Sequence, residues 1–181
     1  MKLENVAYCL FGNNVIIGPH IRRQIDFLKG VVPAVFRHRQ MDDLGCGDGK
    51  VTLLLKDIFL PSRLRGFDVD AGLVRRARRR GVEAGVGNLE GDIPTGELAV
   101  LWGVLHHLQD CGVCLKKLRD SYPLIFIREP LRSSYFRWLE LGHTLRKAEI
   151  EALVNEYLPG SQVYYCGNSI MVFYVSPDSR F

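Results

Sequence analysis

Hydrophobic and polar positions along the chain follow two different periods. Between about residues 19 and 36, apolar residues recur every three to four positions with charged residues between them, which predicts an amphipathic helix. Gly30 and Pro33 predict a break or kink near the end of this helix. Farther along, short apolar runs alternate with helical periodicity, and residues 124–127 form the continuous apolar run that central parallel strands use.

Strands are predicted to alternate with helices through most of the chain. In sequence order these elements are a strand at 40–44, a helix at 50–59, a strand at 64–69, a helix at 72–80, strands at 82–86 and 98–101, a helix at 110–122 and a strand at 124–127. Such alternation predicts a doubly wound parallel sheet. After a helix at 144–158, two strands at 162–166 and 169–175 are separated by Gly167-Asn168, which indicates a hairpin. We therefore expect an α/β protein with a mostly parallel sheet that ends in an antiparallel hairpin, preceded by an N-terminal helical segment.

Composition fits a single globular domain. The 181 residues are 47% hydrophobic and 24% charged with a net charge of +4, which permits an anionic partner without demanding one. We expect one domain over 1–181, with a helical cap at 1–39 and a core at 40–181. No apolar run reaches the roughly 18 residues of a membrane span, and Glu4 and Asn5 stand where a signal peptide needs apolar residues. The resulting expectation is a cytoplasmic protein.

Five cysteines, an odd number, fit free thiols in a reducing compartment. Cys111 and Cys114 form a CxxC pair, which invites a zinc interpretation. A structural zinc site needs four ligands, and the sequence has no second CxxC and no HxxxH. We therefore expect no metal and interpret the pair as small buried residues on a helix.

The most informative stretch runs from Asp43 to Gly49, where one acid precedes three glycines at alternate positions. Glycines between a strand and a helix let the backbone approach a ligand closely. This spacing differs from the dinucleotide fingerprint, which has two residues between its second and third glycines. It resembles the first motif of the class I S-adenosylmethionine (SAM)-dependent methyltransferases, acid-apolar-Gly-x-Gly-x-Gly. The resemblance implies a seven-stranded Rossmann-like sheet and SAM binding by Asp43, Gly45, Cys46 and Gly47.

Asp68 is the second strong position. It ends the predicted second strand 23 residues after Gly45 (68 − 45), where an acid on the neighbouring strand can accept hydrogen bonds from both ribose hydroxyls. In the family the next residue packs on adenine, which here is Val69. The competing interpretation is a helix-capping acid, and Asp70 suits that role better.

Two further segments resemble motifs of the same family. Residues 87–94 resemble the segment after the third strand, which implies that Asn88 accepts from the adenine amine and that the amide of Leu89 reaches a ring nitrogen. Asp92 is the competing candidate, because two extra residues leave the alignment open. Residues 101–108, which end in Val-Leu-His-His-Leu, resemble the segment after the fourth strand.

From that last segment, the resemblance implies backbone contact between Trp102 and the methionine part of SAM. Its two histidines, His106 and His107, invite a catalytic interpretation. Adjacent helical residues point about 100° apart, so a shared metal is disfavoured. In this family these histidines are mostly scaffold, and one of them as a catalytic base is the alternative.

One position departs from the family pattern. Asp42 stands in the first strand where an aliphatic residue is usual, and an unpaired buried carboxylate is costly. Either a nearby Arg or His pairs with it, or the strand end is more open than usual. The arginines at 75–80 form a basic stretch, for which a solvated helix face is favoured over an RNA site because they wrap around a helix and no aromatics are interleaved.

The resemblance therefore implies a methyltransferase that uses SAM, with a small-molecule acceptor favoured over nucleic acid. The segment after the fifth strand mixes arginines and aromatics that suit a planar or anionic acceptor: Arg128, Arg132, Tyr135 and Trp138. The alternatives are an RNA or protein methyltransferase, a SAM-binding protein without transferase activity, and an NAD-dependent oxidoreductase. The glycine spacing and the lack of a Tyr-x-x-x-Lys motif count against the last.

Overall fold

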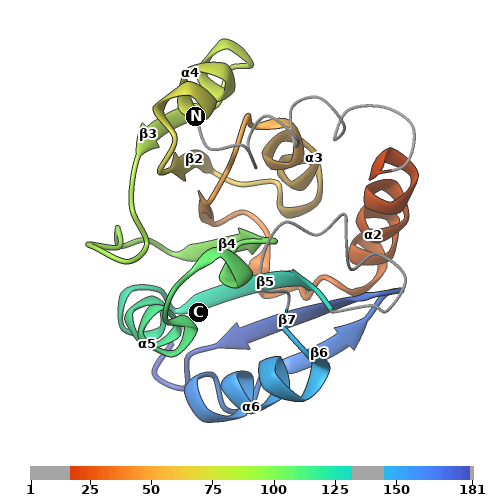
Figure 1. The fold of residues 1–181 in the computed structure, drawn as a ribbon. Helices are drawn as coiled ribbons and strands as arrows, with labels where there is room; N and C mark the ends of the chain where they lie inside the picture. The colour runs from red at the N-terminus through yellow and green to blue at the C-terminus, as the bar shows by residue number, and fades with distance from the viewer. Residues whose placement is uncertain (1–16, 132–144, 180–181) are drawn as a thin grey trace.

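A computed structural model describes residues 17–131 and 145–179 of the chain (Figure 1). Its strands are β1 (Gln40–Leu44), β2 (Arg63–Asp68), β3 (Glu83–Val86), β4 (Leu98–Trp102), β5 (Leu124–Pro130), β6 (Gln162–Tyr165) and β7 (Ser169–Val175). Its α-helices are α2 (Ile17–Val31), α3 (Lys50–Phe59), α4 (Ala71–Arg79), α5 (Cys111–Ser121) and α6 (Lys147–Tyr157). Two short 3-10 helices are η1 (Ala34–Phe36) and η2 (Leu105–His107).

The strands form one seven-stranded sheet in the order β3-β2-β1-β4-β5-β7-β6. The pairs among β1 to β5 are parallel, whereas β7 lies antiparallel to both β5 and β6. The order steps from β1 to β2 and β3 on one side and to β4 and β5 on the other, so the sheet has its switch point between β1 and β4. The predicted α/β fold, with its terminal antiparallel hairpin, is confirmed.

Helices cover both faces of the sheet (Figure 1). On one face, α2, α3 and η1 pack against the sheet in a cluster that includes Leu28, Phe59 and Phe126. On the other face, α5 and α6 pack in a second cluster that includes Leu115 and Ile150. Burial of these apolar side chains stabilises the fold.

The first helix ends where the sequence predicts a break. α2 stops at Val31, one residue after Gly30, and Pro33 then precedes the 3-10 turn η1. Proline lacks the amide hydrogen that would continue the helix. The turn places Phe36 in the core beneath α2, fully buried.

Asp42 is fully buried and paired, which confirms the first of the two expected solutions. Arg65 on β2 donates Nε to Oδ1 at 2.7 Å and Nη2 to Oδ2 at 2.5 Å, and the hydroxyl of Tyr122 donates to Oδ2 at 2.8 Å. Burial and the hydrogen bond to Asp42 raise the pKa of Tyr122, so its hydroxyl stays a donor. The carboxylate is therefore compensated by one charge and three hydrogen bonds.

Strand β5 continues past the apolar run that predicts it. It includes Arg128, Glu129 and Pro130, because β7 pairs with them in register from Met171 to Ser169. The sequence places these three residues in the connection after the strand. Both charged residues are buried there, at 7% and 0% exposed. Two buried charges at a strand end are unusual, and their contacts define part of the site described next.

Candidate functional site

The glycine loop leaves β1 and enters α3 at the carboxyl edge of the sheet. A side chain at Gly45 would bring its Cβ to 2.5 Å from Val104, and one at Gly49 to 3.1 Å from Ala77 of α4. These two glycines therefore let the loop pack against its neighbours. Gly47 differs, because its φ is +55° and the Cβ direction meets nothing within 4 Å. Its backbone faces open space, as a loop that contacts a ligand requires.

Asp68 at the end of β2 holds this loop. Its Oδ2 accepts the amide hydrogen of Gly47 at 2.9 Å, and its Oδ1 accepts that of Asp70 at 2.9 Å. The half-buried carboxylate has a raised pKa, chiefly because burial penalises its charge. Each oxygen keeps a second lone pair. Asp70 is the N-cap of α4 and accepts from the amides of Gly72 and Leu73, as predicted.

Asp43 lies beneath the loop and is 2% exposed. Its Oδ2 accepts from the hydroxyl of Thr52 on α3 at 2.5 Å, while its Oδ1 has no partner among the described residues. Burial raises the pKa of Asp43 to about 7. The site thus contains a buried carboxyl group that has one oxygen without a partner among the described residues and a pKa near neutrality.

The side chain of Cys46 points away from the loop's open face. It is buried in a small cluster with α4, and a Cβ on Gly66 would lie 2.9 Å from its Sγ. The amides of Gly45 and Cys46 both donate to the carbonyl of Phe67 on β2. Cys46 therefore presents its backbone, and not its side chain, to the open face of the loop.

The residues predicted to flank adenine lie after β2 and β3. Val69 follows Asp68 directly and is 71% exposed. Leu89 is buried in the core, whereas Asn88 is exposed and its Oδ1 accepts from the amide of Glu90 at 3.0 Å. The turn is tied to α5 through Lys117, whose ammonium donates to the carbonyls of Glu90 and Gly91.

The end of β4 is organised by Glu129 of β5, a residue that the sequence analysis assigned no role. Its Oε1 accepts the amides of Val104 at 2.6 Å and Leu105 at 2.8 Å, and its Oε2 lies 2.7 Å from Nδ1 of His106. The carboxylate is 0% exposed and the imidazole 12% exposed. This contact fixes His106 through Nδ1, and the ring of His107 lies against that of His106, tilted by 41° with 4.0 Å between the centroids.

Arg128 faces the other side of the sheet. Its Nη2 donates to Oγ of Ser169 at 2.7 Å, and its Cζ lies 5.2 Å from the ring centre of Trp102. Ser169 also accepts from Nε2 of Gln24 on α2, at 2.8 Å. Burial lowers the pKa of Arg128 to about 10. Ser169 and Gln24 are both 0% exposed, and no pattern in the sequence singles them out.

The structure thus brings together the predicted residues of the loop, β2, β4 and the start of the segment 128–138. Asp43, Gly47 and Asp68 lie at adjacent strand ends, while Trp102 and Arg128 are register neighbours on β4 and β5. The remaining predicted acceptor residues, Arg132, Tyr135 and Trp138, lie outside the described residues.

The arginine stretch at 75–80 is partly engaged within the protein. Nε of Arg78 donates to the carbonyl of Ala84 at 2.6 Å, and Arg80 forms an ion pair with Asp48 of the glycine loop at 3.3 Å. These contacts tie α4 to β3 and to the loop. They leave less of the stretch available to form a continuous basic surface.

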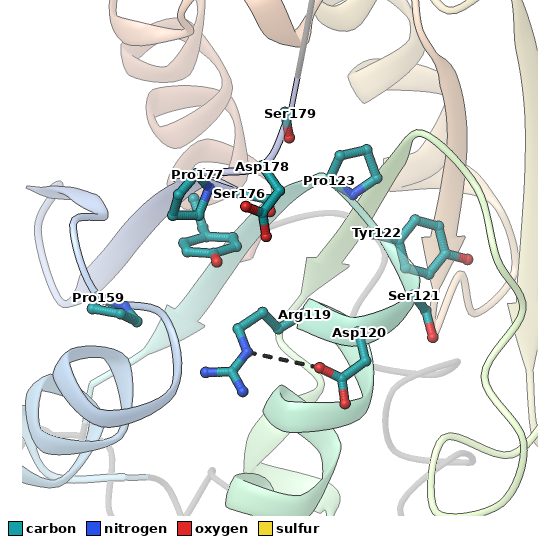
Figure 2. Close-up of a pocket in the computed structure, with 11 residues that line it drawn as sticks. Arg119, Asp120, Ser121, Tyr122, Pro123, Pro159, Ser176, Pro177, Asp178 and Ser179 are labelled. Atoms are coloured by element: carbon teal, nitrogen blue, oxygen red, sulfur yellow. Dashed lines mark ion pairs between the residues drawn. The ribbon is translucent and has the colours of Figure 1, made fainter.

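The pocket in Figure 2 lies at the opposite end of the parallel strands from the glycine loop. It has a volume of about 600 Å³ and is lined by the end of α5, the connection from α5 to β5 (residues 122–123), Pro159, Tyr174 of β7 and the segment after β7. Arg119 and Asp120 form an ion pair on its wall at 3.8 Å. Strand β5 begins here and β7 ends here, so this pocket is separated from the glycine loop by the length of the strands.

The CxxC pair lies on α5 as two free thiols. Cys111 donates to the carbonyl of Leu105, and burial raises the pKa of Cys114 to about 12. Within residues 17–131 and 145–179, no three His, Cys, Asp or Glu side chains are grouped to hold a metal ion. In the same residues, no helix is both long and apolar enough to span a membrane.

Comparisons with known proteins agree with this geometry. A methyltransferase-domain family model matches residues 43–121, from the acid of the glycine loop to the end of α5. A protein of Pyrococcus horikoshii OT3 has the same fold at a TM-score of 0.70 and 16% identity, over 93% of this chain and 97% of that chain. No curated protein sequence matches this chain.

Two methyltransferases of stated substrate share the fold. Magnesium protoporphyrin IX methyltransferase from Synechocystis PCC 6803, solved with bound SAM, is 12% identical at a TM-score of 0.68, over 96% of this chain and 91% of that chain. A possible histamine N-methyltransferase from Thermotoga maritima is 15% identical at a TM-score of 0.68, over 87% and 89%. At these identities the likeness establishes the fold.

Sheet order, glycine loop and strand-end acid together define a class I, Rossmann-like methyltransferase fold. Residues 43–121 match a methyltransferase-domain family model, and the predicted resemblance to the class I SAM-dependent methyltransferases is confirmed. SAM is the cofactor of that family.

Proposed function

We propose that this protein transfers a methyl group from SAM to a small-molecule acceptor. The observation that carries the proposal is the hydrogen bond from the Gly47 amide to Asp68, which sets the loop and the strand-end acid side by side. A ligand that contacts both needs a polar group for each, and a nucleoside with a charged amino-acid tail has them. The family model over residues 43–121 supports the same ligand.

The described residues fit the parts of SAM. Asp68 keeps lone pairs for the ribose hydroxyls, and the exposed side chain of Val69 offers an apolar surface to adenine. Asn88 and the amide of Leu89 then serve the adenine edge, with Asp92 still the competing residue. Gly45, Gly47 and the backbone of Cys46 and Trp102 line the methionine side.

Asp43 gives a specific test of fit for the charged end of the cofactor. Its Oδ1 is a buried acceptor without a partner among the described residues. The ammonium group of SAM supplies the donor and the positive charge that such an oxygen lacks. The carboxylate form of Asp43 is then favoured, although burial alone raises its pKa.

Methyl transfer from SAM is an in-line displacement. A lone pair of the acceptor forms the new bond to the methyl carbon, the carbon–sulfur bond breaks, and its electron pair stays on sulfur as S-adenosylhomocysteine. Because the sulfonium is already activated, the protein contributes mainly by positioning.

An acceptor that must lose a proton also needs a base, and His106 is the better placed of the two histidines. Its Nδ1 is engaged by Glu129, which leaves Nε2 as the nitrogen that takes a proton.

Calorimetric titration tests the cofactor. We expect SAM and S-adenosylhomocysteine to bind, and NAD to bind more weakly than either. Tighter binding of NAD than of S-adenosylhomocysteine would show that the loop serves a dinucleotide.

A SAM-binding protein without transferase activity is the second candidate, because residues 17–131 and 145–179 add little to the sheet and its covering helices. Incubation with labelled SAM and a metabolite extract separates the two. Transfer of label to an extract component identifies an enzyme and its acceptor, whereas cofactor binding without transfer identifies a binding protein. A parallel incubation with total RNA and protein tests the macromolecular alternative, which transfer of label to either would support.

A further inference from the structure

The carboxyl end of β5 holds a positive charge without an acidic partner. Arg128 is only 7% exposed, and no carboxylate lies within 4.0 Å of its nitrogens in the part of the chain that the structure describes. The adjacent Glu129 does not neutralise it, because its carboxylate is engaged by the amides after β4 and by His106. Burying an unpaired charge is costly, so such a group is a candidate for ligand recognition.

A chain of buried side chains orients this guanidinium. Oγ of Ser169 accepts from Nη2 of Arg128 at 2.7 Å and from Nε2 of Gln24 at 2.8 Å, and Nε2 of Gln24 lies 2.6 Å from Nε2 of His20. Ser169 and Gln24 are fully buried. No member of the chain is an acid, and burial together with the charge of Arg128 lowers the pKa of His20.

Two buried atoms of this chain have no hydrogen-bond partner among the described residues, namely Nε of Arg128 and Oε1 of Gln24. Buried polar atoms in native proteins nearly always have partners, from the protein, from water or from a ligand. The unpaired Nε belongs to a side chain that is more than nine-tenths buried and carries a charge. A bound anion therefore supplies both the hydrogen-bond acceptor that Nε of Arg128 lacks and the negative charge that its guanidinium lacks.

The position of Arg128 assigns this anion to the acceptor side. The guanidinium lies against the ring of Trp102 at the end of β4. A Cβ at Gly103 would lie 3.5 Å from Nη1 of Arg128 and 3.8 Å from Cε1 of His106. The guanidinium of Arg128 and the imidazole of His106 thus both lie beside Gly103. In the sheet, β4 separates β5 from β1 and β2, which carry the glycine loop and Asp68.

We propose that Arg128 binds an anionic group, a carboxylate or a phosphate, on the methyl acceptor, with Ser169 and Gln24 as positioning residues. The planar fork of a guanidinium matches either anion, and the Trp102 ring keeps it in place on one side. This inference rests on the proposed function, since it places the acceptor where the methyl group of SAM is delivered. It also excludes neutral and cationic acceptors as preferred substrates.

Equilibrium dialysis tests the inference without requiring methyl transfer. Protein saturated with S-adenosylhomocysteine is dialysed against a metabolite extract divided by anion exchange, and retained compounds are identified by mass. Wild type is compared with Arg128→Met, which keeps an unbranched apolar side chain without the guanidinium and its charge. Arg63→Met is the matched control, because Arg63 pairs with Glu83 on the surface at the start of β2.

We expect wild type and Arg63→Met to retain compounds that bear carboxylate or phosphate. Arg128→Met should retain the same compounds about 10- to 100-fold more weakly, with its affinity for S-adenosylhomocysteine within about twofold of wild type. Failure of wild type to retain an anionic compound, retention of neutral or cationic compounds instead, or equal retention by Arg128→Met overturns the inference.

The same variant identifies the competing source of an anion, the carboxylate of the cofactor. If Arg128→Met loses affinity for S-adenosylhomocysteine but binds methylthioadenosine like wild type, the guanidinium serves the cofactor and the inference is wrong. If the anionic compounds are retained as expected but never methylated, the proposed function fails while the anion site stands.

Thermal unfolding distinguishes ligand recognition from a structural role. Removing an unpaired buried charge should raise the Tm of the ligand-free protein in Arg128→Met, whereas loss of a stabilising contact should lower it. Gln24→Met is a second variant, because it breaks the contact to Ser169 and keeps the charge. We expect it to weaken retention of anionic compounds less than Arg128→Met does, and an equal or larger effect would contradict the central role of Arg128.

Discussion

At the scale of single residues, Asp68 has two tasks. It accepts the backbone amides of Gly47 and Asp70, which sets the shape of the glycine loop, and in the proposed function its remaining lone pairs bind the ribose hydroxyls of SAM. The sequence predicts the second task from the position of the acid at the end of β2. The first becomes visible only in the structure, because it depends on where the loop folds back.

Replacing Asp68 with Ala should weaken binding of S-adenosylhomocysteine about 30- to 1,000-fold. Two charge-assisted hydrogen bonds contribute roughly 1.5–3 kcal/mol each with incomplete additivity, and their loss amounts to about 2–4 kcal/mol. Calorimetry measures the change. Asp70→Ala is the control, because it removes the N-cap of α4 and should reduce stability by about 1 kcal/mol with little effect on affinity. An unchanged dissociation constant in Asp68→Ala would leave Asp68 with its structural task alone.

Asp43 is the residue whose charge should respond to the cofactor. Burial raises its pKa to about 7, against 3.8 for an unperturbed Asp. A raised folded-state pKa gives stability that is fully present below pH 3.8 and is lost as the pH rises toward 7. An ammonium group near Oδ1 reverses this preference, since it favours the carboxylate.

Binding of S-adenosylhomocysteine should therefore weaken as the pH falls below about 7. Asp43 must then release its proton on binding, so the decline should approach tenfold per pH unit from this group. Titrations between pH 5.5 and 8 in buffers of different ionisation enthalpy measure both the affinity and the released proton. Asp43→Asn has no proton to release and should lack this dependence. Equal pH profiles for the two proteins would exclude Asp43 as the responding group.

The predicted site residues separate into two kinds. Glycines and strand-end acids are visible in the sequence, because their roles follow from spacing within one loop or one strand. Glu129 and the contact from Gln24 to Ser169 are not, because their partners lie 23 to 25 and 145 positions away. Only the folded sheet brings such partners together, and residue type alone gives no reason to choose them.

At the scale of elements, the sequence predicts every described strand and α-helix, and most bounds agree to within three residues. The first helix is the exception, because α2 ends at Val31 and the predicted end near residue 36 is the 3-10 turn η1. β1 and α3 have the predicted bounds, and β2 begins and ends one residue earlier than expected. The periodicity of the apolar residues and the positions of glycine and proline between elements carry this information. The clearest difference is β5, which continues through Arg128 to Pro130, because pairing with β7 extends a strand beyond its apolar run.

Strand β2 offers a matched test of buried and exposed ion pairs. Arg65 pairs with Asp42, whose side chain is 0% exposed, whereas Arg63 pairs with Glu83 at 53% and 57% side-chain exposure. Arg65→Met leaves the carboxylate with only the Tyr122 hydroxyl, and should lower the free energy of unfolding by about 3–5 kcal/mol.

Urea denaturation compares Arg65→Met with Arg63→Met, which should stay close to wild type because its pair is exposed and screened. The double variant Asp42→Leu with Arg65→Met should recover part of the loss, since no unpaired charge remains. Equal destabilisation by the two arginine substitutions would show that burial of Asp42 does not set the cost.

At the scale of the whole molecule, the site joins parts of the fold that are separate in sequence. The loop after β1, the end of β2 and the end of β4 meet at one edge, at the switch point between β1 and β4 where open α/β sheets bind ligands. A cofactor that contacts all three should stabilise the sheet as a unit.

Saturation with S-adenosylhomocysteine should consequently raise the Tm of the whole protein. At 100 times its dissociation constant, a ligand that binds only the folded state contributes about 2.7 kcal/mol. For a domain of about this size, each kcal/mol corresponds to roughly 2–4 °C, so the expected rise is about 5–11 °C. Scanning calorimetry measures it, with NAD at the same concentration and with Asp68→Ala as controls. Both controls should give a clearly smaller rise, because one ligand lacks the matching groups and the variant lacks the strand-end acid. If NAD raised the Tm as much as S-adenosylhomocysteine, the edge formed by β1, β2 and β4 would not discriminate between the two nucleotides.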